Sequence, residues 1–432
     1  MNITDRQIMN IAIPSIVSNI TVPLLGLIDV TIVGHLGAAS YIGAIAIGGM
    51  LFNMIYWIFG FLRMGTSGLT AQGYGSADTT QYTATLQRSL IISAILSLAM
   101  IILQYPIRHL AFLFIEASTE VQTYATTYFH ICIWGAPAVL GLYSFTGWFI
   151  GMQNSRYPMY IAITQNIINI VASLIFVYFF HMKVAGIAWG TVIAQYSGLI
   201  MATIFYLRHY HKHAASLGMH ILMERKALRR FFTVNRDIFL RTVCLVSVTV
   251  FFTSTGAAYG DVILAVNTLL MQMFTIFSYI MDGFAYAGEA LSGKNIGARD
   301  YKALHHTIRH LFGWGINMSL LFTILYGLGG EGFLSLLTND ATVIASSSNY
   351  FYWVLAIPLA GFMAFLYDGI CIGATATRIM LQSMIVAVAS FFMLYYSFHH
   401  LMGNHALWMG FIVYLAMRGI MQMILSRKLL QP

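Results

Sequence analysis

The chain has 432 residues, of which 59% are hydrophobic and 8% are charged, and its mean hydropathy is +0.76. Soluble domains carry about 25% charged residues, so this composition excludes a soluble globular protein and predicts a polytopic helical membrane protein. A net charge of +8 could indicate a nucleic-acid partner, but the basic residues lie where membrane topology requires them.

Apolar stretches long enough to cross about 30 Å of hydrocarbon recur along the whole chain. We expect twelve transmembrane helices, over residues 8–33, 42–68, 82–105, 124–150, 157–180, 184–206, 237–258, 262–290, 302–326, 345–373, 378–398 and 404–426. The first stretch is too long for a signal peptide and has no small-residue cleavage site. The predicted fold class is therefore an all-α polytopic membrane protein.

The Lys and Arg residues predict the orientation, because cytoplasmic loops are enriched in them. With the N-terminus in the cytoplasm, only Arg108 and Lys183 of the 22 basic residues fall outside. The protein is thus expected in a bacterial inner membrane, with both termini on the cytoplasmic side. The densest basic cluster, within 225–236, is either an amphipathic helix on the membrane surface or a solvated linker.

Two halves of six spans each are separated by this basic region. The predicted organisation is an N-terminal lobe over residues 1–206, a cytoplasmic linker over 207–236 and a C-terminal lobe over 237–432. An even number of spans returns the chain to its starting side, so the lobes have the same orientation. Such parallel repeats hold their substrate site between the lobes near the membrane midplane.

A repeat at a constant offset of 222 residues supports this division. The matching pairs are Gly75 and Gly297, Asp78 and Asp300, Tyr128-Phe129 and Tyr350-Phe351, Gly151 and Gly373, and Arg156 and Arg378. Pro137 and Pro358 match with a slip of one residue. An offset that recurs at several separate places indicates duplicated architecture and a pseudo-symmetric pair of six-helix lobes.

Asp29 is the leading candidate for function. It lies in the first apolar stretch, where an ionised Asp costs roughly 3 kcal/mol at the bilayer centre. We therefore expect Asp29 to face a water-filled cavity. Pro14 and Pro23 in the same stretch each remove a backbone donor, so the helix is predicted to bend easily.

Other polar groups inside the spans extend this candidate site. Asp282, Glu289 and Asp368 are the remaining acids expected within the membrane, and Asp282 lies on a polar helix face with Gln272 and Tyr279. Asn166, Asn169 and Ser173 share one face of the fifth span, and Thr191 lies in the sixth. These neutral oxygens can hydrogen-bond Asp29, help to bind sodium, or simply join helices.

Enzyme chemistry finds little support in the sequence. The histidines form three groups, of which one is expected on the opposite membrane face and the other two have no carboxylate at ligand spacing. No metal site is therefore predicted, and no nucleotide-binding motif is present. Cys132, Cys244 and Cys371 all lie in apolar stretches, so no disulfide framework is expected. We expect no cofactor, no nucleic-acid partner and a monomer.

Seven stretches, taken together, identify a known family. They are GLIDVTIVGHLG (26–37), FLRMGTSGLTAQGYG (61–75), GWFIGMQNSRYPM (147–159), VAGIAWGTVIAQYSGL (184–199), GDVILAVN (260–267), MDGFAYAGEALSGKNIGARD (281–300) and YDGICIGATATR (367–378). The chain resembles the multidrug and toxic compound extrusion (MATE) family, in its DinF-like branch. The resemblance implies twelve helices in two lobes around a central cavity, and export of organic, often cationic, compounds in exchange for protons or sodium.

The resemblance also implies residue roles. Asp29 matches the coupling acid of the first helix, Asn169 and Thr191 match polar residues of helices five and six, and Asp368 matches the acid of helix ten. Ser173 stands where the family pattern has a second Asp. With one carboxylate in this lobe, protons are favoured over sodium as the coupling ion, although a weak sodium site at Asp29, Asn169 and Thr191 stays an alternative.

The resulting hypothesis is a secondary active efflux transporter that works by alternating access. The predicted ion-coupling residues are Asp29, Asn169, Ser173, Thr191, Asp282 and Asp368, and the predicted substrate-cavity residues are Asn166, Gln272, Tyr279, Phe284, Glu289 and Tyr367. Two alternatives stay open: a flippase of lipid-linked saccharides, which should have a basic cavity, and a membrane-embedded enzyme that uses the histidines.

Overall fold

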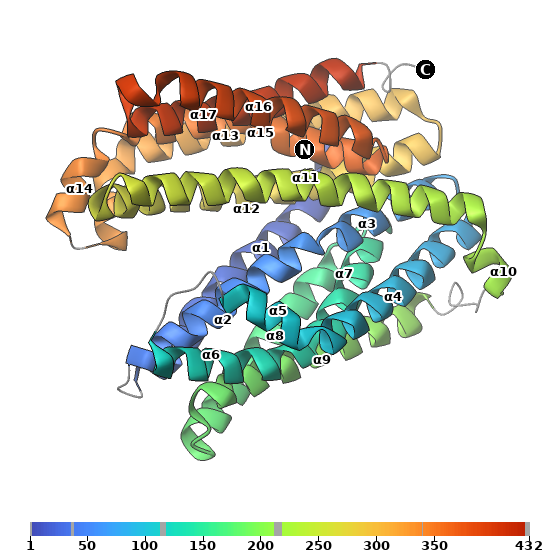
Figure 1. The fold of residues 1–432 in the computed structure, drawn as a ribbon. Coiled ribbons are helices and arrows are strands. Elements are labelled where there is room, and N and C mark those ends of the chain that lie inside the picture. The colour runs from blue at the N-terminus through green and yellow to red at the C-terminus, as the bar shows by residue number, and fades with distance from the viewer. Residues whose placement is uncertain (1, 36–38, 113–117, 211–217, 339, 428–432) are drawn as a thin grey trace. The chain divides into compact units, whose positions relative to one another are not determined.

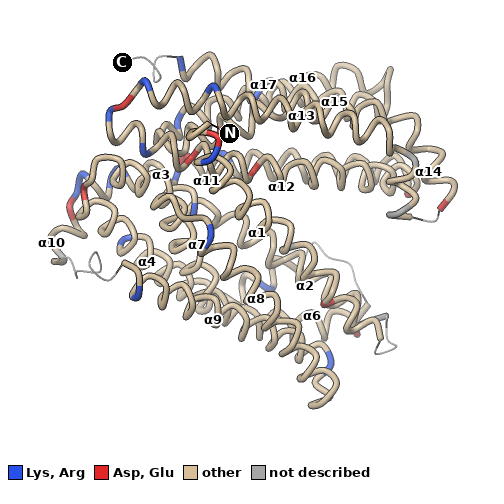
Figure 2. The backbone as a smooth tube through the Cα atoms, turned by 180° about the vertical axis from the view of Figure 1, so that it is seen from behind, with Lys and Arg blue, Asp and Glu red and all other residues tan. Residues whose placement is uncertain are grey.

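The computed structural model describes residues 2–35, 39–112, 118–210, 218–338 and 340–427. Within these ranges the chain is helical and contains no strand, and twelve helical segments are long and apolar enough to cross a membrane. All twelve predicted spans are confirmed. Charged residues are sparse along the backbone (Figure 2), as a lipid-exposed helical protein requires.

The chain forms two compact units, Val17–Phe231 and Met1–Ile16 with Phe232–Pro432, called here the N-terminal and C-terminal units. The N-terminal unit contains the second half of α1 (Ile3–Gly34), then α2 (Ala39–Ile58), α3 (Phe61–Gly75), α4 (Thr79–Ile102), α5 (Gln104–Phe112), α6 (Thr119–Cys132), α7 (Ala136–Gly151), α8 (Arg156–Leu174), α9 (Lys183–Tyr210) and α10 (Met219–Leu222). The C-terminal unit contains the first half of α1 and most of α11 (Arg225–Ala258), then α12 (Asp261–Gly297), α13 (Tyr301–Leu337), α14 (Ala341–Ser347), α15 (Phe351–Gly373), α16 (Thr377–Met402) and α17 (Asn404–Ser426). Figure 1 labels these helices.

The basic region between the halves is helical from Arg225 onward. Helix α11 begins at Arg225 and runs without a break to Ala258, so the basic cluster is the first part of a long helix that also contains a candidate membrane span. The reason is local, because the sequence has no Pro in this range and no Gly before Gly256. Residues 211–217 of the expected linker lie outside the described residues.

The 222-residue repeat is visible in matching helix caps. Asp78 caps α4 by accepting a hydrogen bond from the Gln81 backbone N–H at 2.9 Å, and Asp300 caps α13 by accepting one from Ala303 at 2.9 Å. The residue before each cap, Ala77 or Arg299, has a φ of 56°. Equivalent N-caps of this kind each contribute about 1 kcal/mol, so the two halves begin these helices by the same local mechanism.

Matching glycines hold the central helix pairs together. A Cβ atom at Gly147 of α7 would overlap the Arg63 carbonyl of α3, and a Cβ atom at Gly369 of α15 would overlap the Ala285 carbonyl of α12. Both the glycines and the carbonyls are 222 residues apart. Small residues that let backbones approach are a common basis of helix packing in membranes.

The N-terminal end of α1 belongs to the C-terminal unit, which the predicted boundary at residue 206 did not anticipate. Asp5 Oδ1 lies 2.8 Å from His310 Nδ1 and accepts a hydrogen bond from Trp314 Nε1 at 3.1 Å. At Gly283 of α12, an added Cβ would overlap the Ala12 carbonyl. These contacts attach the first turns of α1 to α12 and α13.

The glycine contacts predict a position-dependent effect of adding one methyl group. Gly369→Ala should lower the melting temperature of the purified protein, because overpacking a close helix contact costs about 1–3 kcal/mol. Gly49→Ala is the matched control, since no atom lies within 4 Å of the Cβ that it would add. This control should melt at or slightly above the wild-type temperature. Equal melting temperatures for both variants would contradict the packing role of Gly369.

Candidate ion and substrate sites

Asp29 is held inside the N-terminal unit, on a helix that stays continuous through Pro14 and Pro23. Only 6% of Asp29 is exposed. Its Oδ1 atom is buried and has no hydrogen-bond partner among the residues that the structure describes. Because a buried charged carboxylate without a partner costs several kcal/mol, a proton or metal cation bound there would remove that cost. The access of Asp29 to a water-filled cavity stays a prediction.

The predicted polar residues of the fifth and sixth spans form one hydrogen-bonded group between α8 and α9. Asn169 Nδ2 donates to Thr191 Oγ1 at 3.0 Å, and Ser173 Oγ donates to Asn169 Oδ1 at 3.4 Å. Asn169 and Ser173 are fully buried. The helices approach closely here, since a Cβ atom at Gly190 would overlap Ser173. These oxygens are therefore already engaged with one another.

Asn166 makes a different contact. Its Nδ2 donates to the Thr21 backbone carbonyl of α1 at 3.0 Å. This carbonyl lies two residues before Pro23, which has no backbone N–H to donate within the helix. Asn166 thus attaches α8 to the part of α1 that the prolines weaken, and it is half-buried.

Tyr128 of α6 connects Asp29 to the α8–α9 group, and sequence analysis did not select it as a site residue. It interacts electrostatically with Asp29 and also contacts Thr191. Cys132, one turn later, is also within electrostatic range of Asp29. The Tyr128 ring fills the space where Gly48 lacks a side chain. In the sequence, Tyr128 stood out only as a member of the 222-residue repeat, and that position does not indicate a chemical role.

Asp29, Asn169 and Thr191, the proposed sodium ligands, are not joined in one hydrogen-bonded group. Among the described residues, no hydrogen bond joins Asp29 to Asn169 or Thr191, and no group of three or more His, Cys, Asp or Glu side chains could hold a metal ion. What the N-terminal unit does bring together is a single buried carboxylate, a tyrosine hydroxyl and three neutral side-chain oxygens.

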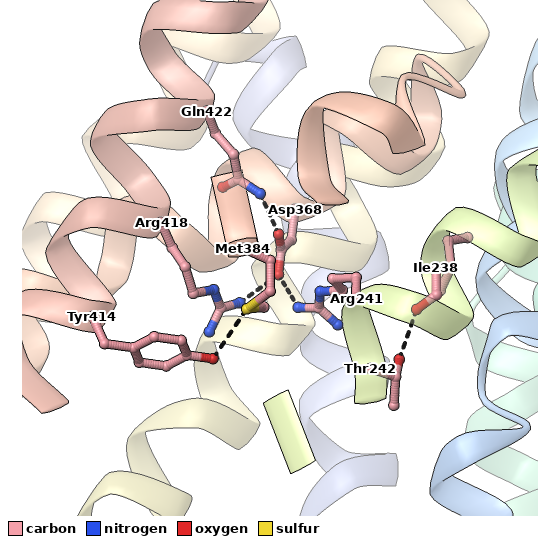
Figure 3. Close-up of polar contacts among 8 residues, drawn as sticks. All are labelled: Ile238, Arg241, Thr242, Asp368, Met384, Tyr414, Arg418 and Gln422. Carbon is pink, nitrogen blue, oxygen red and sulfur yellow. Dashed lines mark hydrogen bonds and ion pairs between the residues drawn. The ribbon is translucent and has the colours of Figure 1, made fainter. Parts of the chain in front are cut away.

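Asp368 of α15 lies in a very different environment inside the C-terminal unit (Figure 3). Arg241 of α11 and Arg418 of α17 both form ion pairs with its Oδ2 atom, the second at 2.6 Å. Gln422, one turn after Arg418, donates its side-chain N–H to Asp368 Oδ1. At most 10% of any of the three charged side chains is exposed. We call these four residues the Asp368 cluster.

Aromatic rings complete the surroundings of this cluster. The Arg418 guanidinium lies over the rings of Tyr414 and Phe365, 5.6 and 6.0 Å from their centroids. Cation–π contacts of this kind add to the ion pairs in a desolvated site. Two guanidinium groups from α11 and α17 pair with the Asp368 carboxylate, and neither partner was identified from the sequence. An ion-coupling role for Asp368 stays a prediction.

The other predicted residues of the C-terminal unit fall into two groups. Gln272 is exposed, and Asp282 and Tyr279 are half-buried and interact electrostatically with each other on α12. Phe284, Glu289 and Tyr367 are buried, with exposed fractions of 2%, 1% and 7%. Phe284 stacks on Trp314, and Tyr367 contacts Phe312, so their assignment to a substrate cavity is a prediction that this packing does not support.

Comparisons with known proteins agree with this architecture. A family model described as MatE matches residues 14–175 and 238–397, which is one match in each half. The DNA damage-inducible protein F of Escherichia coli is 37% identical over 417 residues, covering 96% of this chain and 91% of that protein. The probable multidrug resistance protein NorM of Photorhabdus laumondii is 24% identical over 358 residues, covering 80% and 77%.

Solved structures show the same fold at lower identity. The structure titled as the outward-facing conformation of a multidrug resistance MATE family transporter matches with a TM-score of 0.84 and 19% identity, covering 99% of this chain and 96% of that one. A structure of the Vibrio cholerae MATE transporter VcmN matches with a TM-score of 0.87 and 15% identity, covering 99% and 97%. The chain is therefore a multi-pass inner-membrane transporter and not an enzyme, and it belongs to the MATE family.

Proposed function

We propose that this protein exports organic cationic or amphipathic compounds by antiport, with Asp29 as the ion-coupling residue. The observation that carries the proposal is a buried carboxylate with a buried, unpartnered oxygen atom. Such a group changes its interaction energy strongly when a small cation binds. Relatives named as multidrug resistance proteins support the substrate class.

We infer that the coupling ion is a proton. Hard metal cations are bound by several oxygens, often more than one of them anionic. Among the described residues, Tyr128 and Cys132 interact electrostatically with Asp29 and both are neutral, and Ser173 is engaged with Asn169. A proton needs one carboxylate alone, so this arrangement favours it over sodium.

Asp29 and Asp368 have different roles in this proposal. Asp368 is neutralised by Arg241 and Arg418, so it needs no transported ion. We assign it to holding α11, α15 and α17 together. Asp282 and Tyr279, which are half-buried on α12, are the better candidates for contact with substrate in the C-terminal unit.

The proposed cycle follows from linkage between ion and conformation. Deprotonated Asp29 favours the state in which substrate binds. Protonation from outside then favours a shift of α1 near Pro23, where Asn166 contacts the Thr21 carbonyl, and the compound leaves outward. Coupling requires Asp29 to bind its proton with different affinities in the two states, by an amount of typically 1–3 kcal/mol.

A flippase of lipid-linked saccharides is the second candidate. It would require basic side chains free to bind pyrophosphate. The buried Arg241 and Arg418 are paired with Asp368, so they support this candidate less well than the acidic Asp29 supports antiport.

The basic residues also support a topology with both termini in the cytoplasm, because only Arg108 and Lys183 fall outside in that orientation.

Asp29→Asn should reduce transport about tenfold or more, because the amide cannot exchange a proton. The measurement is uptake of ethidium into proteoliposomes under an imposed pH gradient, and separately under a sodium gradient. Wild-type protein should take up ethidium under the pH gradient but not under the sodium gradient. Asp261→Asn is the matched control, since Asp261 is exposed in the first turn of α12, and it should transport normally. Undiminished transport by Asp29→Asn would remove Asp29 from the mechanism.

Asp368→Ala should destabilise the protein by about 3–5 kcal/mol, because it leaves two buried guanidinium groups without their partner. Gln422→Ala should cost only about 1 kcal/mol. Melting temperatures of purified variants test this order. The double variant Asp368→Ala, Arg418→Ala should recover part of the stability that Asp368→Ala alone loses. If Asp368→Ala kept the wild-type melting temperature but lost transport, Asp368 would instead be an ion-coupling residue.

A further inference from the structure

A pocket of about 230 Å³ lies in the N-terminal unit, between α3, α4 and the first turns of α11, and neither Asp29 nor Tyr128 lines it. All of its lining residues belong to this unit. They are Leu69, Gln81, Thr85, Arg88, Lys226, Ala227, Arg230 and Phe231. A volume of this size holds a compact polar group, and it is smaller than a typical drug-sized pocket of about 300–1,000 Å³.

The pocket is lined by three basic side chains from two helices. Arg88 comes from α4, and Lys226 and Arg230 come from successive turns of α11, four residues apart on one helix face. None of the described lining residues is acidic. Two acids outside the lining interact with lining residues: Glu224 interacts electrostatically with Arg88, and Asp78 accepts a hydrogen bond from the Gln81 backbone N–H. The lining therefore carries an excess of positive charge.

Arg88 makes this a built site rather than a patch of surface charge. It is 8% exposed and donates from Nε to the Leu222 carbonyl at 2.9 Å and from Nη2 to the Ile221 carbonyl at 2.5 Å. These bonds hold the guanidinium in place at the end of α10, and they use two of its five N–H donors. Carbonyl oxygens orient the group but do not cancel its charge.

The remaining lining residues fit an amphipathic anion. Gln81 and Thr85 offer polar side chains, while Leu69, Ala227 and Phe231 form an apolar side. Arg230 is oriented by a bond from Nη2 to Gln72 Oε1 at 2.5 Å. Figure 2 shows the Lys and Arg colour at the start of α11, beside α10, which is the end of the unit expected on the cytoplasmic side. That leaflet is rich in anionic lipid, which attracts basic segments.

We propose that this pocket binds a phosphate group, from an anionic phospholipid head group or from a free phosphate. Arg88, Lys226 and Arg230 contact the phosphate oxygens, and the apolar side receives the glycerol end of a lipid. Guanidinium groups are well suited to this, because their planar N–H donors match phosphate geometry. Occupancy would fix α10 and the start of α11 against α4.

Native mass spectrometry of the full-length protein in detergent tests the proposal. The probes are short-chain phosphatidylglycerol, diacylglycerol with the same chains, and inorganic phosphate. The test variant is Lys226→Gln with Arg230→Gln. The matched control is Arg225→Gln with Arg229→Gln, which removes the same charge from the same helix turns but not from the pocket lining.

The test variant should bind phosphatidylglycerol about tenfold more weakly than wild type, and the control within about twofold. Wild-type protein should bind diacylglycerol far more weakly than phosphatidylglycerol. Competition by inorganic phosphate would identify a site for free phosphate as well, and no competition would identify a lipid site. Equal losses in both double variants, or equal binding of the two lipids, would overturn the proposal. If the test variant does not fold, Lys226→Gln against Arg225→Gln makes the same comparison.

Discussion

The cost of a buried carboxylate is the constraint on which this structure depends. Water is absent from the hydrocarbon region, so each acid there needs a compensating partner. Asp368 has that partner in the protein, because Arg241, Arg418 and Gln422 occupy both of its oxygens. The Oδ1 atom of Asp29 has no hydrogen-bond partner among the described residues. We propose that the partner of Asp29 is the transported ion, and this difference separates a structural acid from a coupling acid.

The two halves of the chain share packing contacts, although their polar sites differ. Helix caps at Asp78 and Asp300, and glycine contacts at Gly147 and Gly369, recur at an offset of 222 residues. Asp29 and Asp368 do not recur, because Phe251 stands at the position equivalent to Asp29 and Thr146 at the position equivalent to Asp368. Close backbone packing leaves little freedom at the glycines, whereas side chains elsewhere can change. The repeat therefore conserves packing, and each unit has its own polar site.

The sequence predicted the twelve spans and the repeat because hydrophobic length and constant spacing are local signals. It also identified Asp29 from its cost in lipid, and Asn169 with Ser173 from their shared helix face. It did not pair Asp368 with Arg241 and Arg418, because these residues are 127 and 50 positions away and no local pattern links them. For the same reason Tyr128 was missed beside Asp29. The attachment of Asp5 to His310 and Trp314 likewise depends on contacts between distant helices.

If Asp29 couples transport to protons, it must release its proton when substrate binds. Proton release from purified protein in weakly buffered detergent solution, recorded with a pH-sensitive dye on addition of ethidium, measures this directly. We expect wild-type protein to release protons, Asp29→Asn to release none, and Gln422→Ala to release as many as wild type. Release of the same number of protons by Asp29→Asn would contradict this role of Asp29.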